Sequence, residues 1–98
     1  MSARKIMISA DSFRFAVADV VARPLRSDCY AMPIVERVPS GLYEIVDGHK
    51  RIAGLIAGGA DEIECVLCDD EDLIAVAGNA ERPDAQREAI AAIYASVN

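Results

Sequence analysis

The chain lacks a long apolar segment. No apolar run approaches the roughly 20 residues that a helix needs to cross a bilayer. At the N-terminus, Met1 to Lys5 lead directly into a strand-like pattern and not into the apolar core of a signal peptide. We therefore expect a cytoplasmic protein without a membrane span.

Cysteine is also scarce. The chain has three cysteines, Cys29, Cys65 and Cys68, an odd number without the spacing of a disulfide framework. This usage suits a reducing compartment. Cys65 and Cys68 have the CxxC spacing of zinc ligands, but they lie within a predicted strand and no second pair of ligands accompanies them. Buried or edge thiols are therefore favoured over a metal site.

Basic residues are too few for a protein that would contact DNA by itself. The 16 Asp and Glu residues outnumber the 10 Lys and Arg residues, which gives a formal net charge of −6. Because affinity for nucleic acid depends on cations that neutralise phosphates, direct DNA binding is disfavoured unless another chain supplies the contact. The acidic run at residues 69–72 is interpreted as a solvated loop and helix start, since carboxylates are favourable near a helix N-terminus.

The sequence shows no repeat, linker or low-complexity segment. With 98 residues, 53% of them hydrophobic and 27% charged, its composition is that of an ordinary globular protein and not of a disordered chain. A chain of this length buries enough surface only if nearly all of it wraps one core. We expect a single domain over residues 1–98.

Apolar periodicity predicts a strand followed by a helix at the beginning of the chain. Ile6 and Ile8 share one face of the strand, because alternate residues of a strand point the same way. Asp11 and Ser12 then offer helix caps. A helix is therefore predicted over residues 13–22.

The middle of the chain predicts a hairpin and a helix. Two β-rich runs, residues 33–38 and 42–46, flank the short connection Pro39-Ser40-Gly41, which favours an antiparallel hairpin. From His49 the apolar residues recur at helical spacing. This helix is expected to stop at Gly58-Gly59.

The last third predicts one strand and two helices. Residues 62–67 alternate as a strand in which Val66 faces away from the apolar side. Residues 73–77 form a short helix, and Pro83 occupies the first position of a final one. The complete order β-α-β-β-α-β-α-α predicts an α/β (α+β) fold, a small mixed sheet with flanking helices.

A glycine stands between the second strand of the hairpin and the next helix. The sequence Asp47-Gly48-His49-Lys50-Arg51 places this glycine directly before basic residues at the helix start. Such a turn aims free backbone N–H groups and the positive end of the helix outward, and glycine lets an anion approach the backbone closely. The pattern indicates either a phosphate site or a purely structural turn.

This stretch resembles the nucleotide-binding core of the ParB/sulfiredoxin superfamily. In ParB-like and sulfiredoxin-like domains, a Pro-Ile-Val strand precedes a motif of the form Asp-Gly-His-x-Arg or Gly-x-x-Arg at a helix start, and an apolar helix, a glycine and a strand follow. The matching pieces here are Pro33-Ile34-Val35, residues 47–51, residues 52–59 and residues 62–67. Residues 79–84 are similar to the Glu-Asn-x-x-Arg segment that follows in ParB proteins.

The resemblance implies a site for the phosphates of a nucleotide such as CTP, ATP or ADP. Gly78 stands where ParB proteins have a glutamate that helps to hold magnesium, so Mg²⁺ binding and hydrolysis are disfavoured. The catalytic cysteine of sulfiredoxin would fall at His49, so that chemistry is not expected. By resemblance, the binding residues are Gly48, His49, Lys50 and Arg51 from the first motif, and Asn79 and Arg82 from the second.

Three functions follow as expectations. The first is a nucleotide- or phosphate-binding ParB-like domain that acts as a regulatory or partner module in DNA partitioning or another DNA-associated system. The second is a small nucleotide-dependent phosphotransferase or nucleotidase on the same fold. The third is a protein-interaction domain that binds no ligand, which the acidic charge and Gly78 favour.

The final helix bears on self-association. Its apolar stripe predicts a homodimer if a chain this small leaves the stripe uncovered. Packing against the chain's own sheet is the alternative. The stripe consists of Ile90, Ile93, Tyr94 and Val97.

Overall fold

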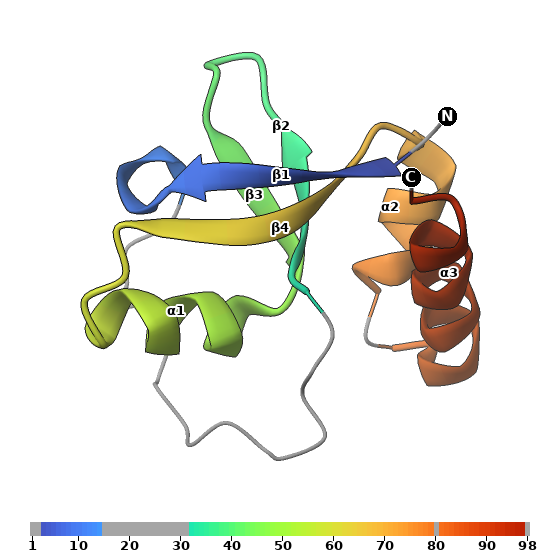
Figure 1. Cartoon of the computed structure of the whole chain (residues 1–98). Coiled ribbons are helices and arrows are strands. Elements are labelled where there is room, and N and C mark those ends of the chain that lie inside the picture. The colour runs from blue at the N-terminus through green and yellow to red at the C-terminus, as the bar shows by residue number, and fades with distance from the viewer. Residues whose placement is uncertain (1–2, 15–31, 80, 98) are drawn as a thin grey trace.

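The computed structural model describes residues 3–14, 32–79 and 81–97 (Figure 1). Its four strands are β1 (Ala3–Ser9), β2 (Ile34–Arg37), β3 (Tyr43–Asp47) and β4 (Glu62–Cys68). They form one sheet in the order β1-β4-β2-β3. β4 is antiparallel to β1 and parallel to β2, while β2 and β3 form the predicted antiparallel hairpin. The sheet is therefore mixed.

Helices pack on both faces of this sheet. They are the 3-10 turn η1 (Ala10–Ser12), α1 (His49–Ala57), α2 (Glu71–Ala77) and α3 (Pro83–Ala95). Figure 1 shows α1 along one side of the sheet, with α2 and α3 gathered away from it. This arrangement confirms the predicted α+β fold with a small mixed sheet and flanking helices. Within the described ranges, no helix is long and apolar enough to cross a membrane.

Two apolar clusters fill the space between the sheet and its helices. Neighbouring residues of a strand point to opposite faces, so each strand serves both clusters. The α1-side core consists of Ile8, Phe13, Val35, Ile45, Ile52, Ile63, Cys65 and Leu67. The α3-side core consists of Ala3, Ile34, Val66, Cys68, Ala77, Ala89 and Ile93.

The second half of β4, Cys65 to Cys68, is buried on both faces, which corrects one expectation. Strict alternation placed Val66 on the polar side with Glu64, but Val66 is fully buried in the α3-side core. The cause is the position of β4 between β1 and β2, with one core on each of its faces. A strand covered on both faces has a continuous apolar run in place of an alternating one.

The helix predicted from Phe13 is wrong at its beginning. Phe13 is extended, with φ −86° and ψ 138°, and it pairs with Tyr43 at the edge of β3. The next residue, Arg14, donates its backbone N–H to the Tyr43 carbonyl at 2.8 Å. Phe13 thereby enters the α1-side core, a tertiary contact that outweighs the local capping signal. The remainder of the predicted helix, residues 15–22, lies outside the described residues.

The apolar stripe of α3 packs within its own chain. Ile93 is fully buried, and Ile90, Tyr94 and Val97 pack against the same α3-side core. The alternative of packing against the chain's own sheet is therefore confirmed, and the uncovered stripe that motivated a homodimer is not what the fold presents. The homodimer itself stays a prediction.

Candidate functional site

The candidate site is built around the turn between β3 and α1. Gly48 caps the N-terminus of α1 in the left-handed conformation, with φ 97° and ψ 24°. Residues with a side chain rarely adopt this conformation, because their Cβ atom crowds the backbone. Glycine is required here for a second reason. A Cβ atom at Gly48 would lie 3.0 Å from both the Cα and the Cβ of Pro33.

Pro33 is held firmly where it touches Gly48. It is fully buried, and its carbonyl oxygen accepts a hydrogen bond of 2.8 Å from the backbone N–H of Val66 in β4. The carbonyl of the preceding residue, Met32, accepts a hydrogen bond from the hydroxyl of Tyr94 in α3. With contacts on both sides, Pro33 gives the turn a rigid support.

The first turn of α1 presents backbone donors. The first hydrogen bond of the helix runs from the N–H of Ile52 to the carbonyl of Gly48, at 3.0 Å. The N–H groups of His49, Lys50 and Arg51 lie ahead of this ladder and point along the helix axis. The N-cap residue, Gly48, has no side chain with which to cap this end of the helix. Such an arrangement, together with the helix dipole, attracts anions.

The side chains of this turn are basic. His49 and Lys50 are exposed, Arg51 is half-buried, and the first turn of α1 contains no acidic residue. Burial, followed by the negative charge of Asp47, raises the pKa of Tyr94 to about 12, while the positive charge of Arg51 acts in the opposite direction. Asp47 and Arg51 therefore both lie within electrostatic range of Tyr94, beside the turn.

The starts of the other two α-helices are built differently. Asp70 caps α2, because its Oδ1 atom accepts hydrogen bonds from the N–H groups of Asp72 and Leu73, at 3.1 and 3.2 Å. α3 begins with Pro83, which has no N–H, and with the acidic Asp84. Of the three described α-helices, α1 is the one whose first turn contains basic residues and no acidic residue.

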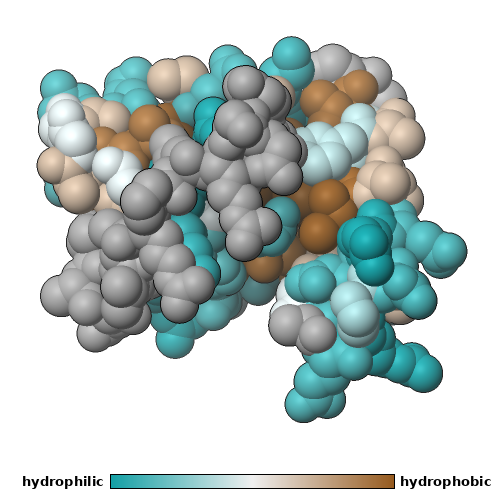
Figure 2. Space-filling model, turned by 90° about the horizontal axis from the view of Figure 1, so that it is seen from below, coloured by the Kyte–Doolittle hydropathy of each residue, from teal (hydrophilic) through white to brown (hydrophobic). Residues whose placement is uncertain are grey.

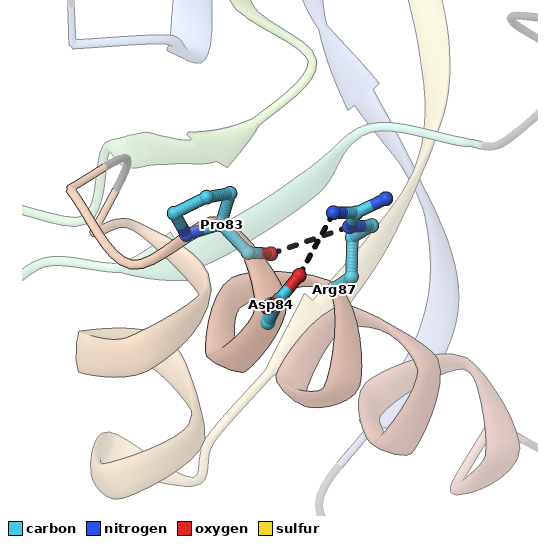
Figure 3. Close-up of polar contacts among 3 residues, drawn as sticks. All are labelled: Pro83, Asp84 and Arg87. Carbon is cyan, nitrogen blue, oxygen red and sulfur yellow. Dashed lines mark hydrogen bonds and ion pairs between the residues drawn. The ribbon is translucent and has the colours of Figure 1, made fainter.

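The acid at the start of α3 is engaged within its own helix. Figure 3 shows Arg87 reaching back to Asp84 and Pro83. Its Nη2 atom donates to Asp84 Oδ1 at 3.0 Å, and its Nε atom donates to the Pro83 carbonyl at 3.4 Å. The Arg87 and Asp84 side chains are 76% and 96% exposed, so this ion pair adds little stability.

Asn79 and Arg82, from the second motif, lie in the connection between α2 and α3. Asn79 Oδ1 accepts a hydrogen bond of 3.0 Å from the Glu81 N–H, and the Asn79 carbonyl accepts one of 3.4 Å from the Arg82 N–H. Arg82 is exposed and lines an open depression of about 480 Å³, and Figure 2 shows that hydrophilic residues dominate this end of α3.

The two motifs lie near opposite ends of α3. Arg82 precedes Tyr94 by 12 residues, which corresponds to a rise of about 18 Å along α3. Tyr94, near the C-terminal end of α3, lies close enough to the first motif for the charge of Arg51 to affect its pKa. The structure thus gathers Gly48 and the three basic residues after it at one turn, and it places the side chains of the second motif in a separate connection.

Tyr94 is the residue of this site that sequence reasoning missed. The sequence pattern identifies it only as one member of an apolar stripe, whereas in the structure its hydroxyl bonds to the carbonyl of Met32, the residue before Pro33. A signal was present, because a tyrosine in an otherwise aliphatic stripe brings a hydroxyl that needs a partner when it is buried. The sequence could not indicate which carbonyl would accept it.

An acidic cluster lies away from this turn, on β2, β3 and the start of α2. Glu36 of β2 stands directly opposite Glu44 of β3, and Glu71 of α2 is within electrostatic range. Burial raises the pKa of Glu36, and the charge of Glu44, a hydrogen bond with the Glu44 side chain and the charge of Glu71 act in the same direction. Such a surface repels nucleic-acid phosphates.

Glu36→Gln should raise the free energy of unfolding at neutral pH by about 0.5 kcal/mol, as for other repulsive cross-strand pairs. The pKa of Glu36 is raised above 4.5 in the folded state, so the stability that this group provides is full below that value and is lost as the pH rises through the folded pKa. The gain should therefore shrink on acidification. Urea unfolding at about pH 7 and about pH 4 measures it. An equal gain from Glu62→Gln, an exposed carboxylate on β4, would contradict this explanation.

Cys65 and Cys68 cannot share a metal ion. Cys65 belongs to the α1-side core and Cys68 to the α3-side core, so their side chains point to opposite faces of β4. Both thiols are buried, as predicted, and burial raises the pKa of Cys65 to about 12, which keeps it protonated and unreactive at neutral pH. Cys29 lies outside the described residues. Among those described, no group of three or more His, Cys, Asp and Glu side chains is arranged to hold a metal.

Comparison of the sequence with protein-family models and with curated proteins finds no match.

Proposed function

We propose that this chain binds a phosphate group of a nucleotide at the start of α1 and acts as a regulatory or partner module. One observation carries the proposal. Gly48, in the left-handed conformation, opens a helix whose first three residues are His49, Lys50 and Arg51 and whose first turn contains no acidic residue. The resemblance of this turn and its flanking strands to ParB-like domains supports a nucleotide, such as CTP, ATP or ADP, as the source of the phosphate.

The turn can recognise a phosphate in three ways. The N–H groups at the helix start supply directed donors, and the helix dipole adds positive potential. The guanidinium of Arg51 can form paired hydrogen bonds with two phosphate oxygens, while Lys50 acts as a point charge. Because Gly48 packs on the buried Pro33, the turn is held in place before a ligand arrives, which reduces the entropy lost on binding.

A thermal-shift series tests this proposal. A ligand selective for the folded state stabilises it by about 2.7 kcal/mol at 100 times its Kd, which for a domain of this size corresponds to a rise of the midpoint on the order of 10 °C. CTP, ATP and ADP should each be compared with the matching nucleoside and with inorganic phosphate. Stabilisation should require the phosphate. If neither a nucleotide nor inorganic phosphate shifts the melting midpoint, the proposal of a phosphate site fails, and a protein-interaction domain that binds no ligand becomes the favoured function.

We expect any bound nucleotide to be hydrolysed slowly or not at all. Phosphoryl transfer relies on a positioned metal ion to spread the developing charge, and Gly78, where the resemblance places a metal carboxylate, is the C-cap of α2 and offers no oxygen side chain. A phosphate-release assay with magnesium and with manganese measures this. Turnover at about 1 s⁻¹ or faster, abolished by Arg51→Ala, would instead identify a phosphotransferase or nucleotidase.

The acidic surface favours a role in which another chain, and not this one, contacts nucleic acid. With a net charge of −6 and the cluster of Glu36, Glu44 and Glu71, the chain is poorly suited to hold DNA by itself. In a DNA-associated system, another chain would supply that contact. The partner could be a different protein or, through a surface other than the α3 stripe, a second copy.

A further inference from the structure

We infer that Tyr94, on α3, is a positioning residue that holds the phosphate turn in its binding geometry. The inference rests on the function proposed above and extends it to α3, which contributes no residue to the first motif. It concerns the hydroxyl group of Tyr94, not the packing of its ring.

A short series of contacts connects Tyr94 to the turn. The Tyr94 hydroxyl donates a hydrogen bond to the carbonyl of Met32. The next residue is Pro33, whose own carbonyl is bonded to the Val66 N–H of β4 at 2.8 Å. Pro33 is thus fixed between α3 and the central strand. Its Cα and Cβ lie 3.0 Å from the place where a Cβ atom of Gly48 would stand, so it packs directly on the glycine.

The surroundings of Tyr94 keep its hydroxyl protonated, so that it can donate this hydrogen bond. Burial, and after it the charge of Asp47, raises the pKa of Tyr94 to about 12, so the hydroxyl remains a donor throughout the neutral range. Met32 offers a backbone carbonyl, which does not titrate. Arg51 lies within electrostatic range of the same hydroxyl. Tyr94 is therefore bonded to the residue before Pro33 and also lies within electrostatic range of the side chain expected to bind phosphate.

A phenylalanine at this position would preserve the apolar packing. Tyr94 is one of the residues packed against the α3-side core, and its ring would fill the same space without the hydroxyl. What would be lost is the bond to Met32. The segment of Met32 and Pro33 would then keep the bond to Val66 but lose the one to α3, so its position relative to Gly48 would change. The structure would persist while the turn loses its exact placement.

Tyr94→Phe tests the inference, with Tyr43→Phe as the matched control on β3. Binding of CTP, ATP and ADP should weaken about fivefold in Tyr94→Phe, the factor expected for one net hydrogen bond, and should be unchanged in Tyr43→Phe. In the free protein, the amide NMR signals of Gly48, His49 and Lys50 should shift in Tyr94→Phe alone. A role confined to stability would lower the melting midpoint without moving either readout.

The two readouts separate failure of this inference from failure of the proposed function. If the wild type binds nucleotide and Tyr94→Phe binds it equally well, Tyr94 does not position the site and the inference is overturned. If the wild type binds no nucleotide, the proposed function fails, and the turn signals of the free protein decide the positioning role by themselves. Unchanged signals at Gly48, His49 and Lys50 would then overturn it as well.

Discussion

Gly48→Ala should lower the free energy of unfolding by about 2–5 kcal/mol. Two costs add at this position. A side chain in the left-handed conformation, at φ 97°, costs about 1–2 kcal/mol. The new methyl group would also meet Pro33 at 3.0 Å, and overpacking of a buried contact costs about 1–3 kcal/mol more.

Gly41→Ala provides the matched control. Gly41 also has a positive φ, 88°, but a Cβ atom there would meet nothing within 4 Å. It pays the backbone cost without the contact, so its loss should be about 1 kcal/mol. Urea unfolding of both variants isolates the contribution of Pro33. Equal losses in the two variants would show that Pro33 yields easily, and the turn would then not be the rigid support described above.

Arg51→Ala should weaken nucleotide binding about 10- to 100-fold while changing stability by less than about 1 kcal/mol. The expected loss in affinity reflects hydrogen bonds between a charged donor and phosphate oxygens, which are stronger than neutral ones. Arg51 is half-buried in the first turn of α1, so its guanidinium can reach a ligand at the helix start. Its removal leaves the buried Ile52 and Ala53 of the same helix in place.

Arg87→Ala is the control for the loss of one positive charge. Arg87 is exposed on α3 and pairs with Asp84 of its own helix, so its removal should leave nucleotide affinity unchanged. Titration calorimetry of wild type and both variants measures the difference. If Arg51→Ala retains wild-type affinity, phosphate does not bind through this side chain. If both variants weaken binding equally, only net charge matters.

The local signals of the sequence predicted most of the elements. The hairpin follows from the connection containing Gly41, α1 from the helical spacing that begins at His49, and α3 from Pro83 at its first position. Each of these signals acts over a few residues. The extended conformation of Phe13 was not predictable in this way, because it arises from pairing with Tyr43, a residue distant in sequence.

The candidate site was predictable to the same extent. The turn at Gly48 and the basic residues after it are visible in the sequence, because glycine conformation and helix starts are local. The support behind the turn is not, since Pro33 reaches Gly48 only through the pairing of β2 with β3 and β4. The burial of Val66 and the contact of Tyr94 with Met32 likewise depend on which strands and helices become neighbours.

The central claim, that phosphate binds at the start of α1, is tested most directly by an NMR titration of the ¹⁵N-labelled protein with CTP, ATP, ADP and inorganic phosphate. The amide signals of His49, Lys50 and Arg51 should move most, and saturably, because their N–H groups lie ahead of the helical hydrogen bonds. Matching nucleosides should leave those signals in place. The claim would be contradicted if the chemical shifts of these three amides did not change at any ligand concentration. It would also be contradicted if the largest changes occurred around Arg82, at the start of α3.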